Sequence, residues 1–431
     1  MDTATPSETE DSQEPAIISE SGDLVLSLRH EVGKGLWQKY KYRVNTQEIQ
    51  RNSKYFDHLL CGPFVEAQKV SEALQRLRQV SGSPAEIPSA DLPVLEIEDM
   101  GMISVSKSIH GLMSDFLRAL HDQEMVGKVN ILGNIANLTV VADRFDALEW
   151  FSHYVARRKL LRPKDISEAK MTEIQLRQKL FVGSLLDYEP WVGLSSQRLI
   201  IKGSARWQTD AKDEAINAAW WILPKGLEEE LQYRRECILD TLSSLQAHFI
   251  DIYSSRERQC KLGYSDSLAC DAFQLGEAIR WLSRVDLLRF HSKVYDVDVS
   301  PQIYKGDMYD LIGTLRSCPE YQINSNHSHC GFRTRLLPIV ETIEHALTEV
   351  GICLECWEQR RSEHAWISTK RLPVWRMSGP LKLANKGISC IKNHAKARDM
   401  FTAMIRNWSA RDNHAEDLHL ANLSSGMKLG R

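Results

Sequence analysis

The sequence predicts an α+β domain near the N-terminus, built as a small sheet capped by helices, followed by a mainly α-helical region. Two observations predict this fold class. Three short segments with strand-like character fall within the first hundred residues, whereas apolar residues beyond residue 164 recur mostly at helical spacing. The length of 431 residues allows two or three domains with hydrophobic cores. Because 43% of the residues are hydrophobic and 26% are charged, a largely disordered or collagen-like chain is not expected.

The predicted sheet has three strands. Residues 23–28 and 38–44 are expected to form a hairpin, because both segments have strand-like patterns and Gly33-Lys34-Gly35 between them is a turn signal. Residues 92–99 are the third predicted strand. Helices are expected at residues 46–60, 105–120, 132–142 and 146–158, and an inserted helix with a loop at residues 68–90.

The region that follows is predicted to be mostly helical. The helices are expected at residues 170–185, 227–253, 273–288 and 336–354, where apolar residues recur every three or four positions. Residues 187–207 are expected to be strand-like because they contain the apolar run from Leu199 to Ile201.

These patterns divide the chain into four parts. Residues 1–20 are acidic and polar and are expected to form a disordered tail. The α+β domain spans residues 21–160, and the mainly helical region with its Cys/His cluster spans residues 161–376. Residues 377–431 form a basic tail, with a helix expected at 389–408. Because its basic residues are dispersed, a solvated or loosely docked tail is favoured over a nucleic-acid arm.

Several segments between residues 20 and 160 form an ordered series. Asp23-Leu-Val-Leu26, Tyr42-Arg-Val-Asn45, Ser53-Lys-Tyr-Phe56 and Phe64-Val-Glu66 suit a strand, a strand, a helix and a turn. Val94-Leu-Glu-Ile97, Phe116-Leu-Arg-Ala-Leu120 and Leu138-Thr-Val-Val-Ala-Asp143 suit a third strand and two helices. In this order and spacing the segment resembles a BTB/POZ domain. The layout of the chain is similar to that of fungal BTB/POZ proteins that append a helical, cysteine-bearing region.

The chain departs from the family pattern at three places. Asn45 stands where the family usually has His, and the insertion at 68–90 is longer than in most animal members. His121-Asp-Gln-Glu replaces the Tyr-Thr-Gly-like turn of the family. The order of the motifs, and no single motif, therefore carries the resemblance.

The resemblance implies that the domain binds other proteins, either a second copy of itself or a partner such as a cullin-type ubiquitin-ligase scaffold. In the family the docking residues lie on the helix with the Ser-x-x-Phe signature and on the segment after it. The corresponding residues here are Tyr55, Phe56, Leu59, Leu60 and Phe64. At helical spacing Phe56 and Leu60 also suit a hydrophobic core, so the sequence leaves both roles open.

Six of the nine cysteines fall between residues 260 and 356, and His327 and His329 lie just before Cys330 in this stretch. Zinc prefers four Cys or His ligands in a tetrahedron, and its binding supplies folding energy. The candidate ligands are Cys260, Cys270, Cys318, His327, His329, Cys330, Cys353 and Cys356. A structural zinc site is one interpretation, and reduced core cysteines with surface histidines are the other. Cys61, Cys237 and Cys390 lie outside this cluster and are expected to be packing residues.

The sequence favours a non-enzymatic adaptor or scaffold that binds proteins, in its most specific form a substrate adaptor for a cullin-type ubiquitin ligase. It contains no P-loop, dinucleotide-binding, nucleophile-elbow, kinase or His-Glu-x-x-His motif. A transcriptional or chromatin regulator with a zinc-stabilised C-terminal block is the alternative. The net charge of −3 and the lack of paired zinc-finger spacing disfavour it. A metal-dependent enzyme is disfavoured because no acid/base constellation accompanies the cysteines.

Targeting signals are not apparent in the sequence. The first 22 residues are acidic and contain no basic residue, unlike a secretory signal or a transit peptide. No apolar run approaches the ~18–20 residues that span a bilayer. We therefore expect a cytoplasmic or nuclear protein with reduced cysteines and with no membrane or nucleic-acid partner.

Overall fold

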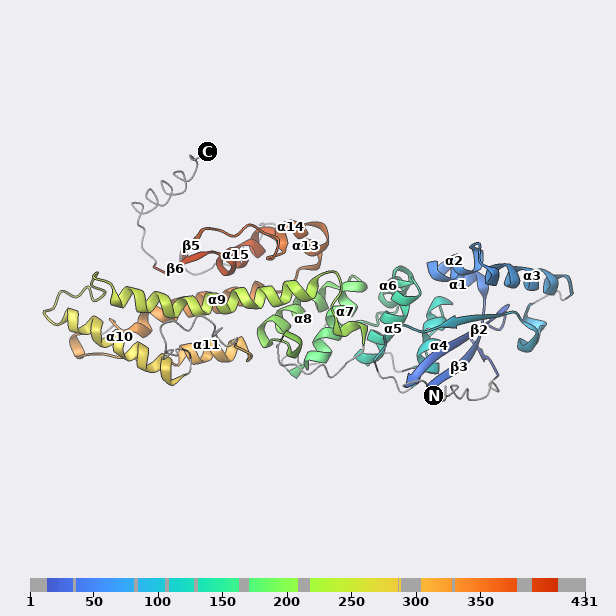
Figure 1. The fold of residues 1–431 in the computed structure, drawn as a ribbon, viewed down its shortest axis with the longest axis horizontal. Helices are drawn as coiled ribbons and strands as arrows, with labels where there is room; N and C mark the ends of the chain where they lie inside the picture. The colour runs from blue at the N-terminus through green and yellow to red at the C-terminus, as the bar shows by residue number, and fades with distance from the viewer. Residues whose placement is uncertain are drawn as a thin grey trace, which may run out of the picture. The chain divides into compact units, whose positions relative to one another are not determined.

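The computed structural model divides the chain into two compact units (Figure 1). It describes residues 14–33, 36–80, 84–104, 108–127, 131–162, 170–207, 218–285, 287, 304–327, 330–377 and 390–409. The first unit comprises Met1–Leu199, Thr209–Glu228 and Ile352–Leu354, and the second comprises Ile200–Gln208, Glu229–Gly351 and Glu355–Arg431. Among the described helices, none is both long enough and apolar enough to cross a membrane.

A four-stranded sheet lies in the first unit, and it contains the three predicted strands. Strands β2 (Leu24–Gly33) and β3 (Leu36–Val44) form the expected antiparallel hairpin, and β4 (Val94–Glu98) runs parallel to β2. In β4 the side chains of Leu95 and Ile97 are buried, whereas their neighbours are exposed, as the alternation predicts. The strand order is β1-β3-β2-β4.

The short strand β1 (Ala16–Ile17) was not expected, because residues 1–20 read as a disordered tail. Its two residues pair in parallel with Tyr42 and Arg43 of β3. Ile18 then becomes buried, and its backbone N–H donates to the carbonyl of Arg43 at 3.0 Å. The expectation of disorder is therefore wrong for this segment, while residues 1–13 lie outside the described part of the chain.

Helices follow and accompany the sheet in the first unit, and the sequence predicts all of them except the last. They are α1 (Thr46–Asn52), α2 (Lys54–Cys61), α3 (Val65–Val80), α4 (Ile109–Leu120), α5 (Leu132–Arg144), α6 (Leu148–Arg157), α7 (Glu173–Leu185) and α8 (Glu189–Lys202). The unit extends past residue 160, the expected end of the α+β domain, because α7 packs against α5. The segment expected to be strand-like is the helix α8. Its apolar run of Leu199 to Ile201 is fully buried, and a short apolar run suits a buried helix as well as a strand.

The Ser-x-x-Phe signature joins α2 to the core of the first unit. The hydroxyl of Ser53 caps α2 by accepting from the backbone N–H of Phe56, and it donates to the carbonyl of Phe145 at 2.6 Å. The ring of Phe56 is fully buried and stacks on that of Phe145, with 5.3 Å between the ring centroids. Phe56 is thus a core residue, and we correct its candidate role as a docking residue.

The second unit is mainly helical and also contains a small parallel pair of strands. Its elements are α9 (Leu227–Ser254), α10 (Ser267–Arg284), α11 (Met308–Arg316), α12 (Phe332–Ala346), α13 (Leu354–Gln359), α14 (Arg361–His364), β5 (Val374–Arg376), α15 (Cys390–Thr402) and β6 (Ile405–Asn407). Part of the expected basic tail therefore belongs to this fold. Met400 and Phe401 of α15 are fully buried, because an apolar face lies between the basic residues. Residues 410–431 lie outside the described part.

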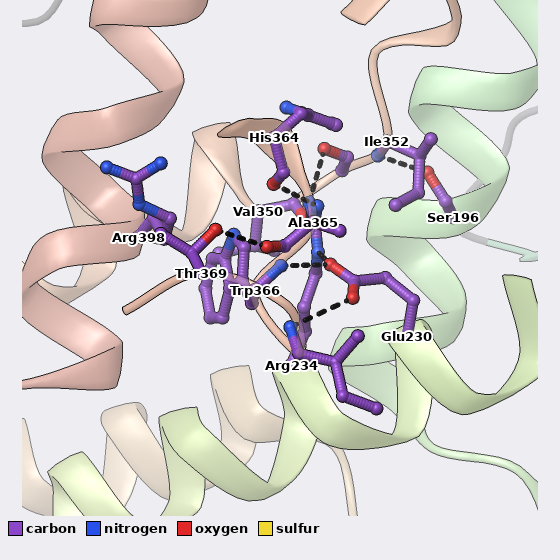
Figure 2. A network of polar contacts seen from close by, with 12 residues as sticks. Ser196, Glu230, Arg234, Val350, Ile352, His364, Ala365, Trp366, Thr369 and Arg398 are labelled. Carbon is purple, nitrogen blue, oxygen red and sulfur yellow. Dashed lines mark hydrogen bonds and ion pairs between the residues drawn. The ribbon is translucent and has the colours of Figure 1, made fainter. Parts of the chain in front are cut away.

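A buried ion pair on α9 organises the backbone of the second unit (Figure 2). Nε of Arg234 lies 2.7 Å from Oε1 of Glu230, and both side chains are fully buried. Arg234 also donates to the carbonyls of Val350, Gly351 and His364 at 2.8 to 3.2 Å. The carboxylate of Glu230 accepts from the backbone N–H groups of residues 366 and 367. Each charge is therefore matched by several hydrogen bonds.

Replacing Arg234 with Met should lower the free energy of unfolding by about 3–5 kcal/mol, since Glu230 and the backbone carbonyls lose their buried partner. The control is Arg76→Met on α3, whose ion pair with Glu72 is largely exposed. That change should cost less than about 1 kcal/mol. Urea denaturation followed by tryptophan fluorescence compares the two variants, and similar small losses would contradict the role given to Arg234.

Candidate metal centre

Four of the predicted ligands converge in the second unit: Cys260, Cys270, His327 and Cys330. Their ligand atoms all lie within 4.8 Å of one another. The sulfur of Cys260 is 3.4 Å from Nδ1 of His327 and 3.6 Å from the sulfur of Cys330. We call this group the first centre. It brings together the loop after α9, the helix α10, a 3₁₀ turn at Ser325–His327 and the start of α12.

Hydrogen bonds to α10 and α12 position the loop that carries Cys260. The two carboxylate oxygens of Asp271 on α10 accept from the backbone N–H groups of Gln259 and Cys260, each at 2.8 Å. Arg335 on α12 donates to the carbonyl and side-chain oxygens of Gln259 at 2.6 and 2.7 Å. Because these contacts are made by protein groups alone, they order the loop without a ligand.

The imidazole of His327 is oriented by a carboxylate. Its Nε2 lies 2.9 Å from Oδ1 of Asp266, and Asn324 donates to the other oxygen of Asp266 at 2.8 Å. The hydrogen bond to Asp266 raises the pKa of His327 above its usual value, and it lowers the pKa of Asp266. With Nε2 donating to Asp266, Nδ1 presents its lone pair to Cys260. This carboxylate–histidine arrangement is typical of histidines that bind metals.

The thiols of the first centre have different proton affinities. Burial raises the pKa of Cys260, but hydrogen bonds with Ser267, the backbone of Leu262, Cys330 and His327 outweigh it and lower the pKa to about 7. In Cys330 burial raises the pKa, and the bond to Cys260 raises it further. In Cys270 burial and the neighbouring thiols raise the pKa to about 12. One thiolate therefore forms readily near neutral pH, and further thiolates need a compensating positive charge.

The donor set fits a metal ion that prefers soft ligands. Zn–S bonds of about 2.3 Å and Zn–N bonds of about 2.0–2.1 Å place sulfurs about 3.8 Å apart in a tetrahedron, with a slightly shorter S–N separation. The measured separations of 3.6 and 3.4 Å are close to these values. Three thiols and one imidazole also complete a tetrahedron and leave no open position, as in structural sites. A buried cluster of this kind could hold a metal ion.

The other predicted ligands lie elsewhere. Cys318 is fully buried outside both Cys/His groups of the described residues, and its thiol donates to the carbonyl of Pro319 at 3.5 Å. His329 lies outside the described residues. Cys353 and Cys356 group instead with Cys390 and His394.

Sequence reasoning missed two members of that second group. Cys390 was expected to be a packing residue, and His394 was not considered, because both lie in a segment that reads as a basic tail. The structure places the sulfur of Cys390 2.9 Å from Nε2 of His394, a polar neighbour that the expected packing role did not include. The spacing Cys390-x-x-x-His394 was the available signal, because it resembles one half of a zinc-finger ligand pattern.

The candidate docking residues remain in the first unit. Tyr55 is half-buried, with the guanidinium of Arg144 5.3 Å from its ring centroid. Leu59 and Leu60 are also half-buried, whereas Phe64 is 46% exposed. The sequence did not single out Val65, which follows Phe64 and is 59% exposed. The junction of α2 and α3 therefore presents an apolar surface.

Replacing Cys330 with Ser should remove the metal ion of the first centre, because one of its four donors is lost. Cys318→Ser is the matched control, since Cys318 is a buried cysteine in the same unit that lies outside the Cys/His groups. Elemental analysis of the purified proteins should show about one metal ion fewer for Cys330→Ser and no change for Cys318→Ser. Equal metal contents in the two variants would rule out the first centre as a metal site.

Comparison with known proteins yields no match to a family model, to a curated protein or to a solved structure. The BTB/POZ resemblance therefore depends on the motifs of this chain and their order. The case for a metal depends on the donor set, its geometry and the carboxylate that orients His327.

Proposed function

We propose that the chain is a non-enzymatic adaptor that docks on a cullin-type ubiquitin-ligase scaffold through its first unit and recruits another protein through its second. The observation that carries this proposal is the apolar surface at the junction of α2 and α3. Phe64 and Val65 are 46% and 59% exposed there. The BTB/POZ resemblance assigns docking to this junction.

The order of elements in the first unit supports the resemblance. The hairpin of β2 and β3 is followed by the paired helices α1 and α2, and β4 then returns parallel to β2. The helices α4, α5 and α6 come next, in the order that the motifs predict. Asn45, at the position where the family usually has His, caps α1 by accepting from the N–H groups of Gln47 and Glu48. This departure therefore preserves the start of the helix.

The turn between α2 and α3 holds Phe64 at the surface. The backbone N–H of Gly62 donates to the carbonyl of His58 at 2.9 Å and ends α2. A Cβ at position 62 would lie 2.4 Å from the carbonyl oxygen of His58 and 2.6 Å from the ring of Phe64, so only glycine allows this close approach. The ring packs across the turn and leaves its outer part exposed. Aromatic side chains that lose water on docking contribute strongly to protein interfaces.

We infer that the ion of the first centre is zinc and that its role is structural. Zinc favours the combination of three thiolates with one imidazole, whereas magnesium and calcium prefer oxygen ligands. The closed donor set supports a folding role, because a catalytic zinc keeps a position for water or substrate. Elemental analysis of the full chain identifies the ion, and a protein loaded with a different metal would contradict this assignment.

Replacing Phe64 with Asp should weaken binding to a cullin-type scaffold by at least about tenfold, because a charge is then buried against an apolar partner. The measurement is surface-plasmon binding of the full chain to a panel of purified cullin scaffolds. The control is Val126→Asp, which places the same charge on a residue of the first unit that is already 78% exposed.

Two results would contradict the adaptor proposal. One is that no cullin scaffold binds the wild-type chain. The other is that Phe64→Asp leaves scaffold binding intact and instead converts a dimer into a monomer in light scattering. The surface would then serve self-association.

A further inference from the structure

A second group of thiol and imidazole side chains lies where the segments around α13 and α15 meet. Cys353 directly precedes α13, Cys356 lies on it, and Cys390 and His394 lie on the first turns of α15. The ligand atoms of these four residues are all within 4.8 Å of one another. The sulfurs of Cys356 and Cys390 are 3.8 Å apart, the separation expected for two thiolates on one zinc ion.

The sequence spacing of these residues makes two ligand pairs. Cys353 and Cys356 are separated by two residues, and Cys390 and His394 by three. Cys390 and His394 lie four residues apart on α15 and therefore on the same face of that helix, so both can direct their donors at one point. Cys353 lies just before α13, the helix that carries Cys356. A Cys-x-x-Cys pair followed at a distance by a pair with three intervening residues is a recurrent zinc-binding pattern.

The surrounding charges suit a metal at this point. Nε2 of His394 faces Cys390, while its Nδ1 lies 4.0 Å from a carboxylate oxygen of Glu349. This separation is too long for a hydrogen bond, and the buried Nδ1 has no hydrogen-bond partner among the described residues, so His394 lacks the carboxylate bond that orients His327. The guanidinium of Arg360 lies 3.8 Å from the sulfur of Cys356. It can offset the excess negative charge of three thiolates on one divalent ion.

Hydrogen bonds from two arginines position the two segments that carry the four donors. Arg234 binds the carbonyls of Val350 and Gly351, three and two residues before Cys353. On the other half, Arg398 of α15 donates to the carbonyl of Glu363 on α14. The donors are therefore brought together by a scaffold that does not use them, which lowers the ordering cost of binding an ion.

We propose that Cys353, Cys356, Cys390 and His394 bind a second structural zinc ion, independent of the first centre, that fastens α15 to the segment of α13. This proposal does not depend on the adaptor function or on a partner. It makes the α15 segment, which reads as a basic tail, a metal-held part of the fold.

The test is the zinc content of the full chain, purified under reducing conditions and measured by elemental analysis. The wild-type protein should hold two zinc ions. Cys390→Ser and Cys330→Ser should each hold one, and the double variant should hold none. The matched control is Cys237→Ser, which changes a buried cysteine outside both groups and should retain two ions.

A milder variant separates loss of the site from loss of the fold. His394→Gln keeps three thiols and should release one zinc ion to a chelator at least about tenfold more readily than wild type, while the other ion stays bound. If one ion is present in the wild type and only Cys330→Ser removes it, the second site is wrong and the first centre stands. Loss of both ions from His394→Gln would overturn the independence of the sites.

Discussion

The buried pair of Arg234 and Glu230 is the interaction on which the second unit depends most. Removing two charges from water costs several kcal/mol for each ion, and the cost is offset only when every donor and acceptor finds a partner. Here those partners are backbone groups more than a hundred residues later, at residues 350, 351, 364, 366 and 367. The pair therefore dictates the path of the chain on either side of α13 and α14. That path places Cys353 and Cys356.

At the first centre, too, polar contacts position the chain. Two carboxylates near the start of α10 each fix a different part of the site. Asp271 orders the backbone at Cys260, and Asp266 fixes the ring of His327. Neither is among the proposed metal ligands, yet both decide where ligand atoms lie. Supporting residues of this kind commonly change metal affinity by about 10- to 100-fold when they are removed. The raised pKa values of Cys270 and Cys330 reflect the free-energy cost of forming a second buried thiolate when no cation is bound.

Local patterns predicted the fold class and most elements, because helix and strand periodicities are properties of neighbouring residues. The prediction was wrong where tertiary contacts decide. Helix α8 is buried around Leu199–Ile201, so its apolar run carries no helical period, and β1 pairs through two residues too few to show a pattern. Four ligands of the first centre were in the predicted group, but spacing cannot say which cysteines meet. Cys390 was missed because Cys353 and Cys356 precede it by more than thirty residues, and because His394 lies in the same segment, which reads as a basic tail.

Because both donor sets are closed, the proposed function must reside on the surfaces of the protein and not at the metal centres. A tetrahedron filled by protein ligands has no place for a substrate, so each ion would add folding free energy to the second unit without taking part in chemistry. The apolar junction at Phe64 and Val65 belongs to the first unit and adjoins α2, whose packing at Phe56 and Phe145 involves none of the proposed metal ligands. In the proposed adaptor, docking is therefore independent of zinc, whereas recruitment depends on it. Zinc depletion would then leave an adaptor that still binds the scaffold but no longer recruits the other protein, because only the second, recruiting unit loses its fold.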